Sequence, residues 1–336
     1  MVKLDEIGAA ELDRLEPLWL LLHAHHQAVA PELAPYVDDA ASWPVRRALY
    51  ADTLAAGGFA LVAHEDGTDL GYALVGSEVT HWSATFVTPV TLDELVTLVV
   101  RPGARGKGVG SALLDAAEAR LDAAGSVDRV IGVVPANVRA IELYRRRGFA
   151  PTWLTMTRFR RPPQVDAGAA AAVEPVAVGE VDALEALWLE LHHHHQAVAP
   201  HLGPYIADAE SWEIVRDLFR EAAERDHIVR VGPAHAPSAV AYYDVTRDDP
   251  LWADTWQTGR DVADLKMLVV AADARGRGLG SAVMDAIDAR LAAAGVSDQV
   301  IGAIEPNRDA IRLYERRGFR PAWLQMTRFA SRDAGR

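Results

Sequence analysis

Apolar and polar positions alternate in the same order in two successive parts of the chain. Each part opens with apolar residues at helical spacing, over 10–29 and over 179–198. Short apolar runs typical of strands then mix with further helical patterns. Strands are expected at 59–64, 70–79, 95–100, 129–134 and 153–159, and again at 227–231, 239–246, 265–270, 299–304 and 323–329. Because helices and strands do not alternate strictly, the pattern predicts α+β domains, each with a mixed sheet.

The limits of the predicted domains follow from local composition. A loop with prolines follows the first helix of each part, and Ser42 or Ser211 is expected to cap the next helix. Residues 161–175 are rich in Pro and Ala and have no hydrophobic period, as is typical of a linker. The sequence therefore predicts an N-terminal domain over 1–160 and a C-terminal domain over 176–336.

An internal repeat supports this division. Residues 105–110 read Arg-Gly-Lys-Gly-Val-Gly and residues 275–280 read Arg-Gly-Arg-Gly-Leu-Gly, an offset of 170 (275 − 105), and each copy leads into a helical run. Glycines let backbone N–H groups approach a ligand, and the start of a helix attracts anions. The turn thus indicates a pyrophosphate site in each half, with a turn that only permits tight packing as the alternative.

Composition narrows the possible partners. The net charge of −13 argues against nucleic acid and anionic membranes. The chain has no cysteine, which excludes disulfides, thiolate nucleophiles and cysteine–zinc sites. No apolar run approaches the length of a membrane span, and the first residues lack the pattern of a signal peptide, so a cytoplasmic protein is expected.

At this point the chain resembles a known family. Arg-x-x-Gly-x-Gly after a Val-rich strand is similar to the acetyl-coenzyme A motif of the GCN5-related N-acetyltransferases (GNAT). Asn137, Tyr144 and Gly148-Phe149 resemble that family's second motif, as do their repeat partners. The resemblance implies two tandem domains that transfer an acetyl group from a thioester to an amine. Each domain would have a mostly antiparallel sheet, flanked by helices and splayed between strands 4 and 5 to admit the pantetheine arm.

The resemblance also implies a donor site for acetyl-CoA in each half. A strand N–H would stabilise the thioester oxyanion, and the glycine turn would bind the pyrophosphate. The implied residues are Leu98, Val99, Val100, Arg105, Gly106, Lys107, Gly108, Val109, Gly110, Ser111 and Asn137, and then Val269, Val270, Arg275, Gly276, Arg277, Gly278, Leu279, Gly280, Ser281 and Asn307.

Four residues are the candidates for proton transfer. Tyr144 and Tyr314 lie where family members place the acid that protonates the departing thiolate, with core packing as the alternative. Glu94 and Asp264 each lie eleven residues before the motif arginine (105 − 94 and 275 − 264), where histone-acetylating members carry a glutamate base. Burial at the head of a strand would raise the pKa of such a base, and a solvated acid is the alternative.

Histidines and aromatic residues are the candidates for the acceptor site. Histidines end the first helix of each half, where they could line the acceptor entrance, bind metal or cap the helix. Without converging carboxylates or cysteines, no metal site is predicted. Trp82 and Phe86 pair by repeat with Trp252 and Trp256, as acceptor walls or as inter-domain packing. The predicted acceptor residues are His25, His26, Tyr36, Trp82, His194, His195, Tyr205 and Trp252.

The acceptor class follows from one departure from the family. Members that acetylate ribosomal proteins or α-amino groups carry a glutamate where this chain has Gly132 and Gly302. We therefore expect an acetyltransferase for a small amine, such as an amino sugar, an aminoglycoside-like compound or a polyamine. The chain would act as a monomeric pseudo-dimer or as a homodimer. A mycothiol-synthase-like enzyme and a non-catalytic acyl-CoA sensor or scaffold are the alternatives.

Overall fold

The computed structural model describes residues 2–78, 84–87, 92–163, 172–247 and 253–329. The first half contains β1 (Lys3–Ile7), α1 (Glu16–Val29), α2 (Asp39–Ala55), β2 (Phe59–Glu65), β3 (Thr68–Glu78), β4 (Leu92–Val100), α3 (Val109–Ala123), β5 (Asp128–Val133), α4 (Val138–Arg146) and β6 (Ala150–Arg158). The second contains β7 (Val173–Pro175), α5 (Glu185–Val198), α6 (Asp208–Glu224), β8 (Ile228–Val231), β9 (Ala239–Arg247), β10 (Asp261–Val270), α7 (Leu279–Ala293), β11 (Asp298–Ile304), α8 (Arg308–Arg316) and β12 (Arg320–Phe329).

These elements confirm the predicted α+β class and differ from the expectation in two respects. Strands β1 and β7 open the two halves and were not predicted, and β7 lies inside the segment expected to be a linker. Ser42 and Ser211 are not N-caps, because α2 and α6 begin three residues earlier and bury both hydroxyls. Each hydroxyl instead accepts a hydrogen bond from a tryptophan of the preceding helix, Trp19 or Trp188.

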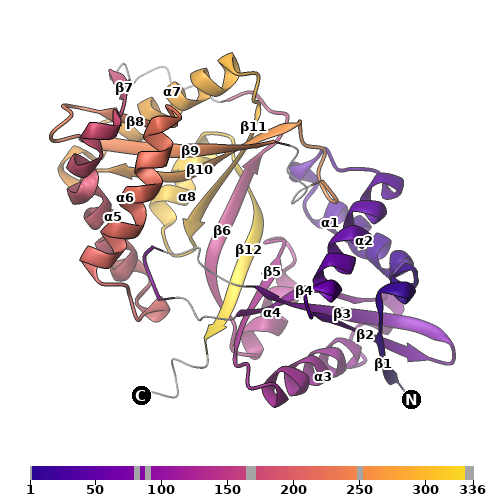
Figure 1. The fold of residues 1–336 in the computed structure, drawn as a ribbon. Coiled ribbons are helices and arrows are strands. Elements are labelled where there is room, and N and C mark those ends of the chain that lie inside the picture. Colours follow the sequence, from indigo (N-terminus) through magenta and orange to yellow (C-terminus); the bar gives the residue numbers. More distant parts are fainter. Residues whose placement is uncertain (1, 79–83, 88–91, 164–171, 248–252, 330–336) are drawn as a thin grey trace.

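The strands of the described residues join one twelve-stranded sheet in the order β1-β2-β3-β4-β5-β12-β6-β11-β10-β9-β8-β7 (Figure 1). The last strand of each half is exchanged. Strand β12 pairs with β5 of the first half, and β6 pairs with β11 of the second. The two exchanged strands cross the middle of the molecule side by side, as Figure 1 shows, and pair with each other. The sequence domains are therefore interlocked within a single sheet.

A buried ionic cluster anchors the end of one exchanged strand. Arg158 of β6 is 1% exposed and forms an ion pair with Asp288 of α7. It also donates to the carbonyl of Arg317 at 2.9 Å, and its guanidinium lies 4.7 Å from the Phe319 ring centroid. A buried charge is costly unless it is paired, and both partners of Arg158 belong to the second half, so this cluster ties β6 to that half.

The reciprocal anchor is built in the same way at the end of β12. Arg328 donates to the carbonyl of Arg147 at 2.9 Å and approaches Glu118 of α3 at 3.3 Å. Its guanidinium lies 5.1 Å from the ring of Phe149. Each half therefore provides a helix, a carbonyl and an aromatic ring for the other half's last strand.

The sheet is splayed between its fourth and fifth strands, as the family resemblance implied. The parallel pairing of β4 with β5 covers only Asp93 to Leu95, although β4 continues to Val100. A bulge in β4 falls directly after Leu95, where the register with β3 shifts. Bulges bend the strand that carries them, which gives the splay a local cause. Strands β10 and β11 repeat this geometry, with pairing that ends at Leu265 and a bulge that follows it.

The loop before the fourth strand of each half reaches across to the other half. The backbone bridges Tyr36 with Trp256 and Phe86 with Tyr205. Phe86 and Trp256 are 2% and 3% exposed, so both pack between the halves. Trp82 and Trp252, which were predicted to contact the acceptor, lie outside the described residues.

Candidate active site

The glycine turns place two rows of backbone amides at helix starts. In the first half, the N–H groups of residues 106–111 make no hydrogen bond to any described residue, and the first helical bond of α3 runs from Ala112 to Gly108 at 2.9 Å. We call this the N-terminal amide row. The C-terminal amide row, residues 276–281, is equally unpaired, and the first bond of α7 runs from Ala282 to Gly278. Unpaired amides at a helix start form an anion site.

Backbone conformation explains the first two glycines of the N-terminal amide row. Gly106 and Gly108 have φ values of +75° and +84°, a region that side chains disfavour. A Cβ placed on either residue would meet no atom within 4 Å, so packing does not require glycine there. The third glycine differs, because a Cβ on Gly110 would lie 3.4 Å from Val100 of β4. The space beside these two glycines is therefore open, as the approach of a bound anion to the turn requires.

The motif arginines join the amide rows to the splayed strands. The Nε of Arg105 donates to the carbonyl of Val100 at 3.0 Å, and Arg275 does the same to Val270 at 3.1 Å. In the second half alone, the Arg275 guanidinium also pairs with Glu190 of α5 at 2.9 Å. That carboxylate offsets one of the positive charges beside the C-terminal amide row.

Tyr144 and Tyr314 lie in equivalent places on α4 and α8. Each is 5% exposed and packs beside the phenylalanine of the following Gly-Phe turn. Neither hydroxyl has a hydrogen-bond partner among the described residues. Burial raises the pKa of both phenols well above the ordinary value, so both keep their protons at neutral pH. Each can therefore donate a hydrogen bond, and core packing and a catalytic role are compatible.

The two predicted bases differ in their surroundings. Glu94 lies on β4 beside Val130 of β5, one residue before the last pair of the splayed strands. Asp264 holds the matching place beside Val300, and its carboxylate lies 2.5 Å from the ammonium of Lys266. Position 96 of the first half, which corresponds to Lys266, is a valine.

His25 lies nearer to the donor residues than its prediction as an acceptor residue implied. Burial lowers its pKa, the Arg105 guanidinium lowers it further, and a hydrogen bond with Asn137 raises it. The carbonyl oxygen of Asn137 accepts from Ala140 at 3.4 Å and caps α4. Asn307 caps α8 in the same way, by accepting from Ala310. The two asparagines thus stabilise the helices that carry the tyrosines.

The other histidines and the loop tyrosines hold the backbone after α1 and α5. His23 lies 3.0 Å from the carbonyl of Val37, and the Tyr36 hydroxyl donates to Ala30 at 2.7 Å. His26 and His195 are largely enclosed, and burial lowers the pKa of each to about 3. The repeat partners His192 and Tyr205 make the same contacts, while the His194 ring lies 6.4 Å from the His195 ring and is tilted by 45° to it. No group of three or more potential metal ligands occurs among the described residues.

The strand exchange brings a tryptophan of one half onto a glycine of the other. A Cβ on Gly132 would lie 2.1 Å from Cε2 and Nε1 of Trp323, and one on Gly302 would lie 2.3 Å from Trp153. Neither tryptophan was predicted as a site residue. The signal was the spacing itself, because both the glycines and the tryptophans repeat at an offset of 170 (302 − 132 and 323 − 153).

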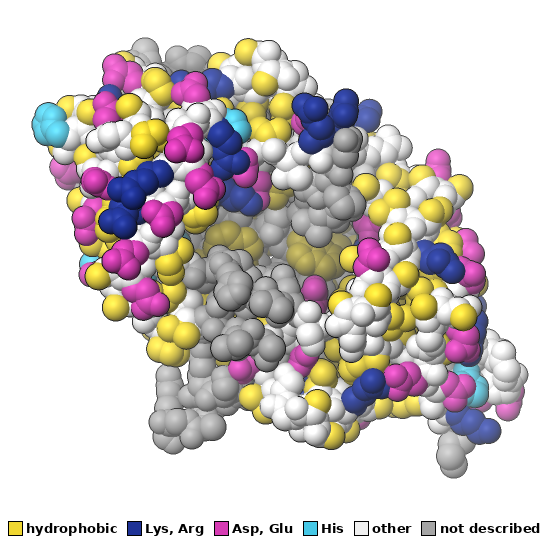
Figure 2. Space-filling view, in the orientation of Figure 1, with side chains coloured by type: hydrophobic (Ala, Val, Ile, Leu, Met, Phe, Trp, Pro, Cys, Tyr) yellow, Lys and Arg dark blue, Asp and Glu magenta, His cyan; other side chains and the backbone are white. Residues whose placement is uncertain are grey.

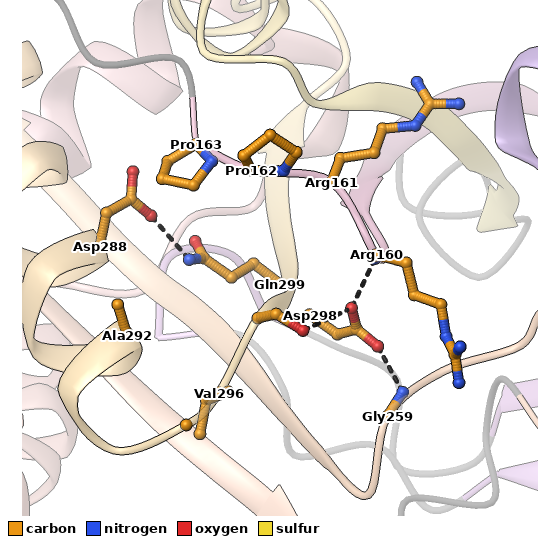
Figure 3. Close-up of a pocket in the computed structure, with 12 residues that line it drawn as sticks. Arg160, Arg161, Pro162, Pro163, Gly259, Asp288, Ala292, Val296, Asp298 and Gln299 are labelled. Carbon is orange, nitrogen blue, oxygen red and sulfur yellow. Dashed lines mark hydrogen bonds between the residues drawn. The ribbon is translucent and has the colours of Figure 1, made fainter.

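A separate cavity of about 680 Å³ lies where β6 leaves the sheet (Figure 3). The two carboxylates that line the cavity already accept hydrogen bonds from N–H groups of the protein. Asp298 accepts from the backbone amides of Arg160, at 2.6 Å, and Gly259, while Asp288 accepts from Gln299 at 2.6 Å. This cavity contains none of the predicted site residues, and residues of both halves line it.

The molecular surface has a hollow between the two halves (Figure 2). Figure 2 shows a face that is hollowed between the two halves, with hydrophobic side chains in the hollow and acidic and basic side chains interspersed around it. No helix in the described part of the chain has the length and apolar character needed to cross a membrane.

Comparisons with known proteins support the fold. The sequence pattern of the acetyltransferase (GNAT) family matches residues 23–149 and 188–319. A GCN5-related N-acetyltransferase from Sphaerobacter thermophilus aligns with a TM-score of 0.55 and 14% identity over 97% of this chain and 95% of its own. A glucosamine N-acetyltransferase region of a fungal multi-domain GH3 β-N-acetylglucosaminidase aligns with a TM-score of 0.53 and 17% identity. That alignment covers 98% of this chain and 38% of the fungal chain. No curated protein sequence matches the chain.

The fold and the family matches together define an enzyme of the acyltransferase class. The family pattern occurs twice and covers more than half of the residues. The chain therefore belongs to the GNAT acetyltransferase family, with one GNAT domain in each half, and the predicted family and fold are confirmed.

Proposed function

We propose that the protein transfers an acetyl group from acetyl-CoA to the primary amine of a small molecule, in its N-terminal half. The observation that carries the proposal is the N-terminal amide row, which lies open at the end of a splayed strand. Six N–H groups that have no partner in the described part of the chain, together with Arg105 and a helix start, match the charge of a diphosphate. Acetyl-CoA supplies the activated acetyl group.

The residues beside the splay can perform the transfer. The edge of β4 after Leu95 has no strand partner among the described residues on its β5 side, so its backbone can bind the pantetheine arm and face the thioester carbonyl. Glu94 lies at this opening and can accept the proton that the attacking ammonium must lose.

Tyr144 contributes as a hydrogen-bond donor to the departing sulfur. A thiol has a pKa of about 8.5, below that of a buried phenol, so complete transfer of the phenol proton to the thiolate is uphill. A hydrogen bond that strengthens as negative charge develops on sulfur still lowers the barrier. The residue therefore stabilises the leaving group and keeps its own proton.

The asymmetry between the halves supports the N-terminal one as the working site. The Asp264 carboxylate already pairs with the Lys266 ammonium on its own strand, so it is engaged by a cation before any acceptor arrives. Glu190 likewise competes for Arg275 beside the C-terminal amide row. The matching residues in the first half are Val96 and Leu21, which carry no charge.

The region over Gly132 supports a small acceptor. The Trp323 indole fills the space in which other family members would place a carboxylate for a peptide amino group. Because a structural relative is described as a glucosamine N-acetyltransferase region, an amino sugar is a sensible first acceptor to test.

Free-CoA release measured with a panel of amines tests the proposal. The panel contains glucosamine, an aminoglycoside, spermidine and a peptide with a free N-terminus. We expect amine-dependent release with at least one small amine. Glu94→Gln should lower kcat by roughly 10²–10⁴-fold, the range of a general base. Asp264→Asn is the matched control and should change kcat less than about 3-fold, because the Asp264 carboxylate is already paired with Lys266.

Two results would contradict the proposal. One is donor binding without CoA release for every amine, which would favour the acyl-CoA sensor. The other is a larger loss of kcat in Asp264→Asn than in Glu94→Gln, which would move the working site to the C-terminal half.

A further inference from the structure

We propose that the acceptor site of the N-terminal half is completed by the C-terminal half, and that Trp323 determines which amines it accepts. The inference rests on the proposed function and adds a residue that binds the acceptor. Its occupant would be a small amine carried on a ring, whose apolar face stacks on the indole.

The position of Trp323 relative to the splay carries the argument. The last pair between β4 and β5 is Leu95 with Ile131, so Gly132 is the first residue of β5 beyond the point where the strands part. The Trp323 indole lies directly on Gly132, because a Cβ added to that glycine would be only 2.1 Å from the ring. The indole is therefore located at the opening where donor and acceptor must meet.

The indole and the proposed base lie on the same face of the sheet. Glu94 is level with Val130, and Gly132 follows two residues later on the same strand, so the pleat directs all three to one side. In a regular sheet, one strand across and two residues along correspond to about 8 Å, and the splay increases this distance. That separation accommodates a single sugar-sized ring between an aromatic surface and a carboxylate.

Trp323 is available for such a contact. It is only partly buried, and it packs against a cluster that contains Leu33, Phe159 and Trp256. The cluster holds one side of the Trp323 indole, and the part of the indole that is not buried can contact a ligand. The reciprocal Trp153 on Gly302 provides the matched control, because it belongs to the opening of the other half.

Steady-state kinetics with the best amine test the inference. We expect Trp323→Ala to raise the acceptor KM by about 10-fold or more, with the donor Kd unchanged. Trp323→Phe should retain most of the affinity, and Trp153→Ala should leave the acceptor KM within about 2-fold of the native value. Gly132→Ala forces the indole aside and should mimic Trp323→Ala, whereas the double variant should be no worse than either single variant. Equal KM effects from Trp323→Ala and Trp153→Ala would overturn the inference.

A binding readout separates this inference from the proposed function. The indole N–H signal of Trp323 in ¹⁵N-labelled Glu94→Gln protein, assigned by its loss in Trp323→Phe, should shift when the amine is added. A shift without turnover in the native enzyme would contradict the proposed function and support the binding site. Turnover without a shift, or with an unchanged KM in Trp323→Ala, would overturn the binding site and leave the proposed function standing.

Discussion

Replacement of Gly106 by alanine tests whether the N-terminal amide row binds the donor. Gly106 has a φ of +75°, and a Cβ there would meet no atom within 4 Å. The substitution therefore creates no clash within the protein. It places a methyl group in the open space beside the N-terminal amide row, in the turn that a phosphate would approach.

The expected magnitudes differ for stability and for binding. An alanine held in the left-handed region costs about 1–2 kcal/mol, which for a chain of this size lowers Tm by only a few degrees. Loss of one charge-assisted hydrogen bond to a phosphate costs about 1.5–3 kcal/mol. Because each 1.4 kcal/mol is a factor of ten, CoA should bind roughly 10- to 100-fold more weakly.

Isothermal titration with CoA, paired with thermal unfolding, separates these effects. Gly103→Ala is the control, because a Cβ there also meets no atom, its φ is not positive, and it lies outside the amide row. Gly276→Ala places the same change in the C-terminal half. Native CoA affinity in Gly106→Ala, at the expected loss of Tm, would refute the assignment of the amide row.

Two further substitutions test the packing that positions the site. Arg158→Met leaves the buried Asp288 carboxylate without its ion-pair partner and should lower the free energy of unfolding, measured by urea denaturation, by about 3 kcal/mol. Arg158→Lys should cause a smaller loss. A change below about 1 kcal/mol in Arg158→Met would show that the pair does not anchor β6. His26 is held neutral, with its pKa lowered to about 3, so its contribution to stability is complete above pH 6.5 and is lost as the pH falls toward 3. Between pH 7 and 5.5 the native protein should lose about 1.3 kcal/mol more than His26→Gln, and an equal loss in both would contradict the burial argument.

The sequence predicted those parts of the fold that local chemistry determines. The amide rows could be foreseen because glycine with positive φ followed by a helix is a local signal, and the structure shows that signal at Gly106 and Gly108. The splay came only from the family resemblance. Its physical cause is a bulge next to Leu95, which depends on the register with a strand about twenty residues away in the chain.

Two parts of the candidate site depend on contacts that a sequence pattern does not contain. His25 was assigned to the acceptor from its place on the first helix, whereas the structure brings it to Arg105 and Asn137. Phe86 and Trp256 could be acceptor walls or packing between the halves on sequence alone, and the structure buries both between the halves. Aromatic residues near a cleft satisfy either role until the neighbouring elements are known.

The exchange of β6 and β12 is the feature least accessible from sequence. Residues 153–159 read Trp-Leu-Thr-Met-Thr-Arg-Phe and residues 323–329 read Trp-Leu-Gln-Met-Thr-Arg-Phe, so these two segments differ at a single position. An unexchanged sheet, with each strand beside its own half, would have the same number of strand pairs and the same kinds of side chain at each place. Local propensity and patterning therefore cannot distinguish the two arrangements.

The exchanged and unexchanged sheets differ in which half contributes the last strand to each site. In the exchanged sheet the tryptophan over Gly132 is Trp323, whereas in an unexchanged sheet it would be Trp153. The acceptor KM of the N-terminal site therefore reports on topology as well as on recognition. If Trp153→Ala raised that KM and Trp323→Ala did not, an aromatic residue would still bind the acceptor, but the strand order β5-β12-β6-β11 would be wrong.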